Sequence, residues 1–322
     1  MPLMNRQSLG VLAAVLSMAC SKPQAAGEDP VRVTIPQGAS VWTVADSLFS
    51  RGVIDSPRWF RMYAKLAGYE RTLQAGVYDF QRGASGRRVL HDLVAGRTAQ
   101  NRLVVPEGLM LNEVAELVEA QLGIPAESFL EAARDSTLVS RVQAREPTLE
   151  GYLYPNTYSV SIGATALDVV KQMVAQFEKR WQPAWDRRLD TLQMTRDEVV
   201  TLASIIEGEA QHPSDLRYVS SVYHNRLARK MRLDADPTVI YSLGKRRRLF
   251  IRDYRIQSRY NTYIIDGLPP HPIAQPSAAT IEAALYPHRS DFLFFVAGPG
   301  GRHVFSRTYR EHLETTRRIR DR

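Results

Sequence analysis

The sequence of 322 residues is 44% hydrophobic and 24% charged, which is ordinary for a globular protein and long enough for two domains. Because Cys20 is the only cysteine, a disulfide within the chain and a cysteine-based metal site are both excluded. No apolar run has the length expected of a transmembrane helix, and the formal net charge of +8 fits contact with nucleic acid, anionic lipid or an acidic polymer.

The first twenty residues predict export, as a signal or a membrane anchor. Arg6 precedes a short apolar run over residues 9–19, and small residues lead into Cys20. The position of Cys20 is similar to that of the lipidated cysteine in a bacterial lipoprotein signal. Two interpretations stay open: a lipid anchor at Cys20, or a signal peptide or short uncleaved anchor with an incidental cysteine. Export by either route argues against nucleic acid as a partner.

Residues 21–30 show no apolar periodicity and predict a tether. Over residues 31–146, a short β-branched run, a glycine turn and a small amphipathic helix recur three times, near Ile35, Phe80 and Val105. Such units bury their apolar faces by stacking. Their spacing resembles LysM modules, which are small sugar-binding units of two strands and two helices. We therefore predict a LysM-like α+β region, with a generic α+β scaffold as the alternative.

A domain boundary is predicted near Pro147, and residues 147–322 are expected to form a mainly helical domain with a small sheet. Asp236 and Pro237 predict the start of a short helix, with Asp236 as its cap, and Gly244 predicts its end. The turn at residues 298–301 separates two apolar runs and predicts a hairpin. Apolar residues at helical spacing predict longer helices over residues 166–181, 197–210 and 215–230.

Several kinds of catalytic site are absent from the sequence. The seven histidines are scattered without zinc-like spacing, and no nucleophile elbow, phosphate loop or dinucleotide motif occurs. The functions that remain are catalysis by carboxylates or binding without catalysis, and neither implies a metal or a cofactor. Two basic runs, at residues 245–248 and in the tail from Arg317, fit either a solvated face or contact with an anionic surface.

One predicted helix carries two acids, Glu207 and Glu209, near its end. At about 100° per residue, Glu209 shares a stripe with Leu202, Ile205 and Ile206, whereas Glu207 points almost opposite. Burial raises the pKa of a carboxyl and makes it a proton donor near neutrality. We therefore predict that Glu209 is the catalytic acid. The alternative is a helix end with both acids solvated.

Three stretches combine aromatic side chains with amide, hydroxyl or acidic ones at places that predict loops. Such residues suit sugar rings, whose faces are apolar and whose edges form hydrogen bonds. Each stretch alone is explained equally well as packing that supports the fold, but together they favour a substrate groove. They cover residues 149–158, 234–241 and 260–270.

These stretches and the two-acid helix together resemble the endolytic murein transglycosylase family, also called YceG-like. The resemblance extends from about Val31 to the tail and rests on several blocks in the same order. It implies a periplasmic, membrane-attached enzyme with a LysM-like region. That enzyme cleaves between N-acetylmuramic acid and N-acetylglucosamine without water and leaves a 1,6-anhydro end. The blocks are Glu150-Gly151, Tyr154 to Tyr158, Leu202 to Glu209, Asn225-Arg226-Leu227, Met231-Arg232-Leu233, Asp236 to Tyr241, Tyr260 to Tyr263 and Gly267 to Pro270.

The resemblance places the catalytic glutamate at Glu209, which is also the residue favoured by the helix phase. It implies peptidoglycan strands as the substrate, termination of nascent strands as the role, peptidoglycan synthases as candidate partners, and no cofactor. Two departures are the lipoprotein-like start and Gly208, which stands where the family often has lysine and predicts a looser helix end. The substrate-binding candidates are Glu150, Tyr154, Asn225, Asp236, Thr238, Tyr260, Asn261 and Tyr263.

Two other functions stay open at this point. A lysozyme-like muramidase would need a second acid, such as Glu150 or Asp236, to direct a water molecule. A non-catalytic cell-wall-binding lipoprotein would use Glu209 only as a structural residue.

Overall fold

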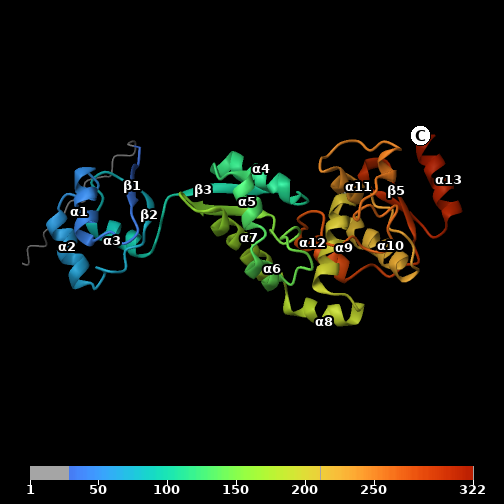
Figure 1. Ribbon diagram of the computed structural model, residues 1–322, viewed down its shortest axis with the longest axis horizontal. Helices are drawn as coiled ribbons and strands as arrows, with labels where there is room; N and C mark the ends of the chain where they lie inside the picture. Colours follow the sequence, from blue (N-terminus) through green and yellow to red (C-terminus); the bar gives the residue numbers. More distant parts are fainter. Residues whose placement is uncertain (1–28, 211, 322) are drawn as a thin grey trace, which may run out of the picture. The chain divides into compact units, whose positions relative to one another are not determined.

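The computed structural model describes residues 29–210 and 212–321, and the chain divides into two compact units, Met1–Arg97 and Thr98–Arg322 (Figure 1). The predicted signal, Cys20 and most of the tether lie outside the described residues. Within the described part, no helix is both long and apolar enough to cross a membrane. The fold class is α+β, with small antiparallel sheets among many helices.

The first unit has the element order strand–helix–helix–strand–helix. Its two strands pair in antiparallel fashion, from Val31 opposite Phe80 to Ile35 opposite Gly76. Ser40 and Ser56 cap the two helices that follow, each accepting a hydrogen bond from a backbone N–H in the first turn. The elements are β1 (Val31–Ile35), α1 (Val41–Ser50), α2 (Pro57–Leu66), β2 (Gly76–Phe80) and α3 (Gly86–Val94).

The second unit begins with an antiparallel strand pair whose partners are far apart in the sequence. Strand β3 pairs with β4 from Gln100 opposite Ser161 to Val105 opposite Asn156. The elements up to the long helix α7 are β3 (Gln100–Val105), α4 (Leu111–Leu122), α5 (Ala126–Ala132), α6 (Ser136–Val142), β4 (Asn156–Ser161) and α7 (Ala166–Arg180).

The rest of the second unit is mainly helical and ends in a hairpin and a helix. Its elements are α8 (Pro183–Leu192), α9 (Arg196–Glu209), η1 (Pro213–Asp215), α10 (Leu216–Ala228), α11 (Asp236–Leu243), η2 (Asp253–Arg255), α12 (Ala278–Leu285), β5 (Phe294–Ala297), η3 (Pro299–Gly301), β6 (His303–Ser306) and α13 (Tyr309–Arg320). The three predicted long helices, the short helix ended by Gly244 in a left-handed conformation, and the hairpin are all confirmed.

The division of the chain differs from the boundary expected near Pro147. All three predicted strand–turn–helix repeats form, but the one that begins at β3 belongs to the second unit. Side chains of β3, α4 and α5, such as Leu103, Val114 and Phe129, share one apolar core with α7 and α9. Strand β3 pairs with β4, which lies beyond the boundary predicted near Pro147. The second unit therefore starts well before that boundary.

Helix α9 is the central element of the second unit. It packs against α8, α10, α11 and α12, and every side chain over residues 199–206 is buried. Leu202, Ile205 and Ile206 are buried as predicted, but so are Ala203 and Ser204 on the other sides. The prediction of a single buried stripe on this helix is therefore wrong, because a helix that is covered on all sides has no solvated face. Beyond its first turn, only the C-terminal end of the helix, where Glu207 and Glu209 lie, reaches solvent.

Candidate active site

Glu209 is the last residue of α9 and is only partly buried. Tyr223 of α10 donates a hydrogen bond from its hydroxyl to Glu209 Oε1 at 3.0 Å. Burial raises the pKa of Glu209 to about 7, and the negative charge of Asp236 adds to the rise, against hydrogen bonds from Tyr223 and the Asp236 backbone. The C-terminal end of a helix carries a partial negative charge, which also disfavours a carboxylate there. Glu209 can therefore hold a proton near neutral pH and still meet a ligand.

Tyr223 is a residue that the sequence analysis missed. Its side chain is 1% exposed and packs edge-on against Phe295 of β5, with ring centroids 5.9 Å apart. Burial raises the pKa of its hydroxyl well above the usual value, so the group remains a hydrogen-bond donor. The available signal was a tyrosine on a buried helix face, whose hydroxyl needs a partner. Its partner could not be named without the packing of α10 on α9.

Asp236 and Tyr263, two of the predicted binding residues, lie beside Glu209. Asp236 accepts hydrogen bonds from the hydroxyls of Tyr263 at 2.7 Å and Tyr254 at 3.4 Å. The two tyrosine rings pack edge to face with centroids 4.7 Å apart. Burial raises the pKa of both tyrosines, and the charges of Asp236 and Glu209 add to the rise. Tyr254 was not predicted, because it stands in a basic stretch without the aromatic pattern.

Asp236 does not cap its helix, contrary to the prediction. Ala235 occupies the cap position of α11, and Asp236 is the first helical residue, with its carboxylate engaged by tyrosines instead. Gly208 explains how this residue comes close to Glu209. A Cβ at position 208 would lie 2.7 Å from the ring of Pro237, so only glycine permits this approach of α11 to α9. The prediction that Gly208 loosens the end of the helix is wrong, since α9 continues regularly to Glu209.

Glu207 faces another part of the unit. Its Oε2 accepts hydrogen bonds from the backbone N–H of Ser277 at 2.8 Å and from Thr280 Oγ1 at 2.7 Å. Glu207 thereby holds the start of α12. Glu207 and Glu209, the two acids at the end of α9, are thus held by different partners.

Glu150 is a second carboxyl with a raised pKa, and it lies apart from Glu209. It is 2% exposed and accepts hydrogen bonds from the Leu111 backbone N–H at 3.0 Å and from Gln275 Nε2 at 2.6 Å. Burial raises its pKa to about 8, against hydrogen bonds from Leu111 and the Tyr241 side chain. None of these partners is shared with Glu209. Glu150 joins three segments of the core and is closed to a polymer.

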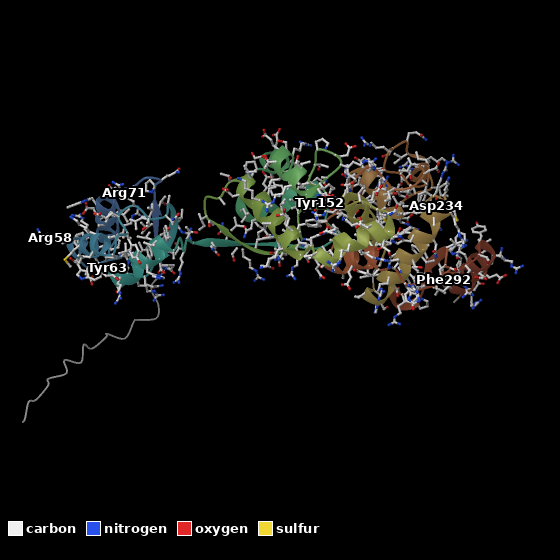
Figure 2. All side chains as sticks on the ribbon, turned by 90° about the horizontal axis from the view of Figure 1, so that it is seen from below. Arg58, Tyr63, Arg71, Tyr152, Asp234 and Phe292 are labelled. Atoms are coloured by element: carbon white, nitrogen blue, oxygen red, sulfur yellow. The ribbon has the colours of Figure 1, made fainter. Side chains whose placement is uncertain are left out.

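Three further candidates hold loops around the site. Asn261 is fully buried and donates from Nδ2 to the carbonyls of Tyr254 at 3.1 Å and Ile256 at 2.9 Å. It therefore fixes the loop that carries Tyr254. Thr238 is also fully buried, and its hydroxyl lies 2.9 Å from that of Thr262. The third, Asn225, donates from Nδ2 to the carbonyl of Phe292, which Figure 2 labels, at 2.9 Å.

Tyr260 and Tyr154 are also engaged within the protein. The Tyr260 hydroxyl lies 2.6 Å from His271 Nε2, and its ring packs edge-on against Tyr241, with centroids 4.8 Å apart. The carbonyl of Tyr154 accepts a hydrogen bond from the hydroxyl of Tyr158. Of the eight binding candidates, the structure brings Asp236 and Tyr263 to Glu209 and gives the others partners in loops or in the core.

A buried arginine lies behind the site. Arg226 donates to the carbonyls of Leu293 at 2.7 Å and Leu233 at 2.8 Å and forms an ion pair with Asp234, labelled in Figure 2, at 3.2 Å. Its positive charge lowers the pKa of Glu209, which limits the effect of burial. The proton affinity of Glu209 is thus set by opposing neighbours.

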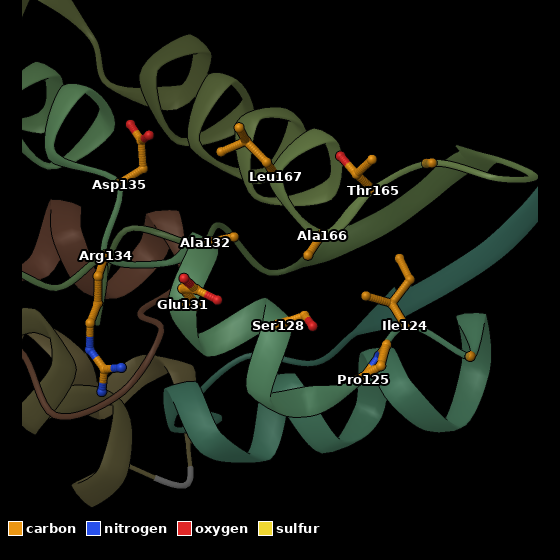
Figure 3. Close-up of a pocket in the computed structure, with 12 residues that line it drawn as sticks. Ile124, Pro125, Ser128, Glu131, Ala132, Arg134, Asp135, Thr165, Ala166 and Leu167 are labelled. Carbon is orange, nitrogen blue, oxygen red and sulfur yellow. The ribbon is translucent and has the colours of Figure 1, made fainter.

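Two further features of the described residues lie apart from the Glu209 site or are lacking there. No group of three or more His, Cys, Asp or Glu side chains in the described part of the chain is placed to hold a metal ion. A hollow of about 680 Å³ lies between the start of α5, the loop after it and the start of α7, lined by residues such as Pro125, Glu131 and Leu167 (Figure 3). It shares no residue with the Glu209 site.

Comparison with known proteins gives consistent matches over most of the chain. A model of the YceG-like family matches residues 33–318. A curated protein of Bacillus subtilis called endolytic murein transglycosylase is 32% identical over 299 residues, covering 88% of this chain and 82% of the relative. A protein of the same name from Streptococcus pneumoniae is 31% identical over 299 residues, covering 83% of this chain and 54% of the relative. The 2.6 Å crystal structure of a yceG-like protein from Listeria monocytogenes has a TM-score of 0.62 and 31% identity, over 90% of this chain and 100% of that one.

Proposed function

The chain belongs to the YceG-like family and is an enzyme of the lyase class, and we propose that it cleaves peptidoglycan glycan strands as a lytic transglycosylase with Glu209 as its acid and base. The observation that carries the proposal is the state of Glu209. Its pKa is raised to about 7, and it stands at a helix end with partial access to solvent.

In the first step, protonated Glu209 gives its proton to the glycosidic oxygen between N-acetylmuramic acid and N-acetylglucosamine. The bond from that oxygen to C1 of N-acetylmuramic acid breaks, and the N-acetylglucosamine side leaves with the proton. The hydrogen bond from Tyr223 stabilises the carboxylate that remains. The nearby carboxylate of Asp236 favours the positive charge that develops at C1.

In the second step, the Glu209 carboxylate takes the proton of the muramic acid 6-hydroxyl, and that oxygen bonds to C1. The product is a 1,6-anhydro end, Glu209 regains its proton, and no water is consumed. The nucleophile belongs to the substrate, so the reaction departs from the glycosidase scheme in which a second carboxylate attacks or directs water.

Hydrolysis is the second candidate, and Asp236 is the observation that favours it. Asp236 is a carboxylate close enough to Glu209 to raise its pKa, whereas Glu150 has other partners. Mass spectrometry of muropeptides released from purified sacculi separates the two reactions. The lyase gives products lighter by one water than those of a muramidase, and finding only reducing muramic ends would reject it. Failure to release any product would favour a non-catalytic wall-binding protein.

The first unit is proposed to be a LysM-like module that contacts glycan. Its strand–helix–helix–strand order over β1, α1, α2 and β2, with the two strands paired, supports this proposal. Co-sedimentation of the full chain with sacculi tests it: substitutions confined to the turn after β1 should weaken retention without changing turnover of short glycan chains. Equal retention of these variants would contradict glycan binding by this unit.

The proposed place of action is the periplasmic face of a membrane, with the first twenty residues as the anchor. There the enzyme would terminate nascent strands beside peptidoglycan synthases. If lipid on Cys20 holds the protein, Cys20→Ala should release the mature chain into the soluble periplasmic fraction. Retention of that variant in the membrane fraction would assign the anchor to the apolar segment itself.

A further inference from the structure

The stretch from Lys245 to Arg255, called here the basic loop, has a composition that the proposed chemistry does not use. It follows α11 and contains six cationic residues and one acid, Asp253. At its tip stand two apolar side chains that are exposed, Phe250 at 53% and Ile251 at 82%. Single exposed apolar side chains are ordinary on a protein surface, but here two of them are adjacent in a strongly cationic segment.

The tip of the basic loop is held in place by its own residues. Asp253 is buried and accepts from Arg247 Nη1 at 2.6 Å and Nη2 at 2.8 Å, and from the backbone N–H of Phe250 at 2.7 Å. The pKa of Asp253 falls to about 2, because the Arg247 guanidinium donates to it. The guanidinium groups of Arg247 and Arg252 lie 5.3 and 5.6 Å from the centre of the Phe250 ring. The apolar tip is thus preformed and surrounded by positive charge.

Four of the six cations in the basic loop form no ion pair with a described residue, among them Lys245 and Arg248. Both of these residues are exposed. Arg246, by contrast, is paired with Glu113 at 2.7 Å. An aromatic and an aliphatic residue beside unpaired cations match the surface of an anionic bilayer, where apolar groups enter the interface and cations meet lipid headgroups. An acidic glycan in water would meet the cations but would offer Ile251 only the faces of its sugar rings, whereas a bilayer offers it a continuous apolar phase.

The basic loop is also joined to the Glu209 site. Tyr254, the residue after Asp253, donates its hydroxyl to Asp236. We infer that the basic loop contacts anionic lipid through Phe250 and Ile251 and so presents the Glu209 site at a membrane surface. This contact is separate from any anchor at the start of the chain, and it does not depend on the reaction that Glu209 performs.

A single-cysteine label can test this contact in the full chain, because Cys20 is the only native cysteine. In a Cys20→Ser background, Ile251→Cys carries an environment-sensitive fluorophore, and Thr191→Cys on α8, which Figure 1 shows far from α11, is the matched control. The protein is mixed with vesicles of phosphatidylcholine, alone or with phosphatidylglycerol. We expect a blue shift at position 251 with phosphatidylglycerol vesicles only, and none at position 191.

Charge variants measure the electrostatic part of the contact. Lys245→Gln and Arg248→Gln should each raise the phosphatidylglycerol concentration needed for half of the fluorescence shift about fivefold. This follows from about 1 kcal/mol of binding free energy per basic residue at an anionic surface. Arg310→Gln, an exposed cation on α13, should leave that concentration unchanged. No shift with either vesicle, or an equal shift with both, would overturn the inference. A shift with lipid-free sacculi in place of vesicles would assign the basic loop to glycan instead and would also overturn it.

Discussion

Two carboxyls of the second unit, Glu209 and Glu150, both have a raised pKa, about 7 and about 8, and burial is the main cause in each. Their surroundings differ. Glu150 is closed from solvent and accepts from Leu111 and Gln275, whereas Glu209 stands at a helix end with one tyrosine donor and partial access. A raised pKa therefore does not identify a catalytic acid by itself. The acid must also be open to the atom that receives its proton.

The largest expected effect separates these two carboxyls by activity. Glu209→Gln should lower the release of muropeptides from sacculi about a thousandfold, because the amide cannot donate or take the required proton. Its melting temperature should stay close to that of the native protein, since the amide still accepts from Tyr223. Comparable turnover by Glu209→Gln would remove the distinction drawn between the two sites.

The second expected effect concerns stability against pH. Because the folded chain holds the Glu150 proton more tightly than the unfolded chain, the contribution of Glu150 to stability should be complete below pH 4.5 and decline up to about pH 8. Glu209 contributes in the same direction up to about pH 7. Glu150→Gln mimics the neutral acid and should remove the larger share of this decline, on the order of a few kcal/mol. Urea unfolding at several pH values measures it, and an unchanged slope would show that Glu150 is ionised in the fold.

Tyr223→Phe tests how Glu209 is tuned. Loss of the donor removes a contact that lowers the pKa of Glu209, so the pH above which activity falls should move upward from about 7. Activity below that pH should drop about tenfold, because the carboxylate left after proton transfer loses a hydrogen bond. A pH–rate profile reports both changes. If activity falls but the pH above which it declines does not change, Tyr223 acts only as a packing residue.

The smallest effect is expected at the neighbouring acid of α9. Glu207→Gln can still accept a hydrogen bond from Ser277 or Thr280, so activity should remain within about twofold of native. The melting temperature should fall slightly, since α12 loses a negative charge at its start. A dead Glu207→Gln variant with active Glu209→Gln would move the active site to the α12 side of the helix.

Local patterns predicted most elements, because caps, glycine turns and apolar periodicity act over a few residues. Helices α7, α9 and α10 and the β5–β6 hairpin were found in this way. The division at residue 97 was not, since it depends on the pairing of β3 with β4 across a long stretch of chain.

The site was predicted in part for the same reason. Glu209 stood out as an acid in an apolar helix, although the stripe that marked it is covered on all sides. Tyr223 and Tyr254 were missed, because their partners come from other elements. Asn261 and Thr238 look like ligand-binding residues in the sequence, but buried residues that hold a loop have the same chemical character.

The most direct test of the difference between Glu209 and Glu150 is to titrate both carboxyls in one sample. With glutamate labelled at its carboxyl carbon, NMR signals are assigned by their loss in Glu209→Gln and Glu150→Gln. The Glu209 signal should titrate near pH 7 and broaden with a soluble paramagnetic agent, and the Glu150 signal should titrate near pH 8 without broadening. A Glu209 signal that titrates near 4.5, or one as protected as that of Glu150, would contradict its role as an accessible acid.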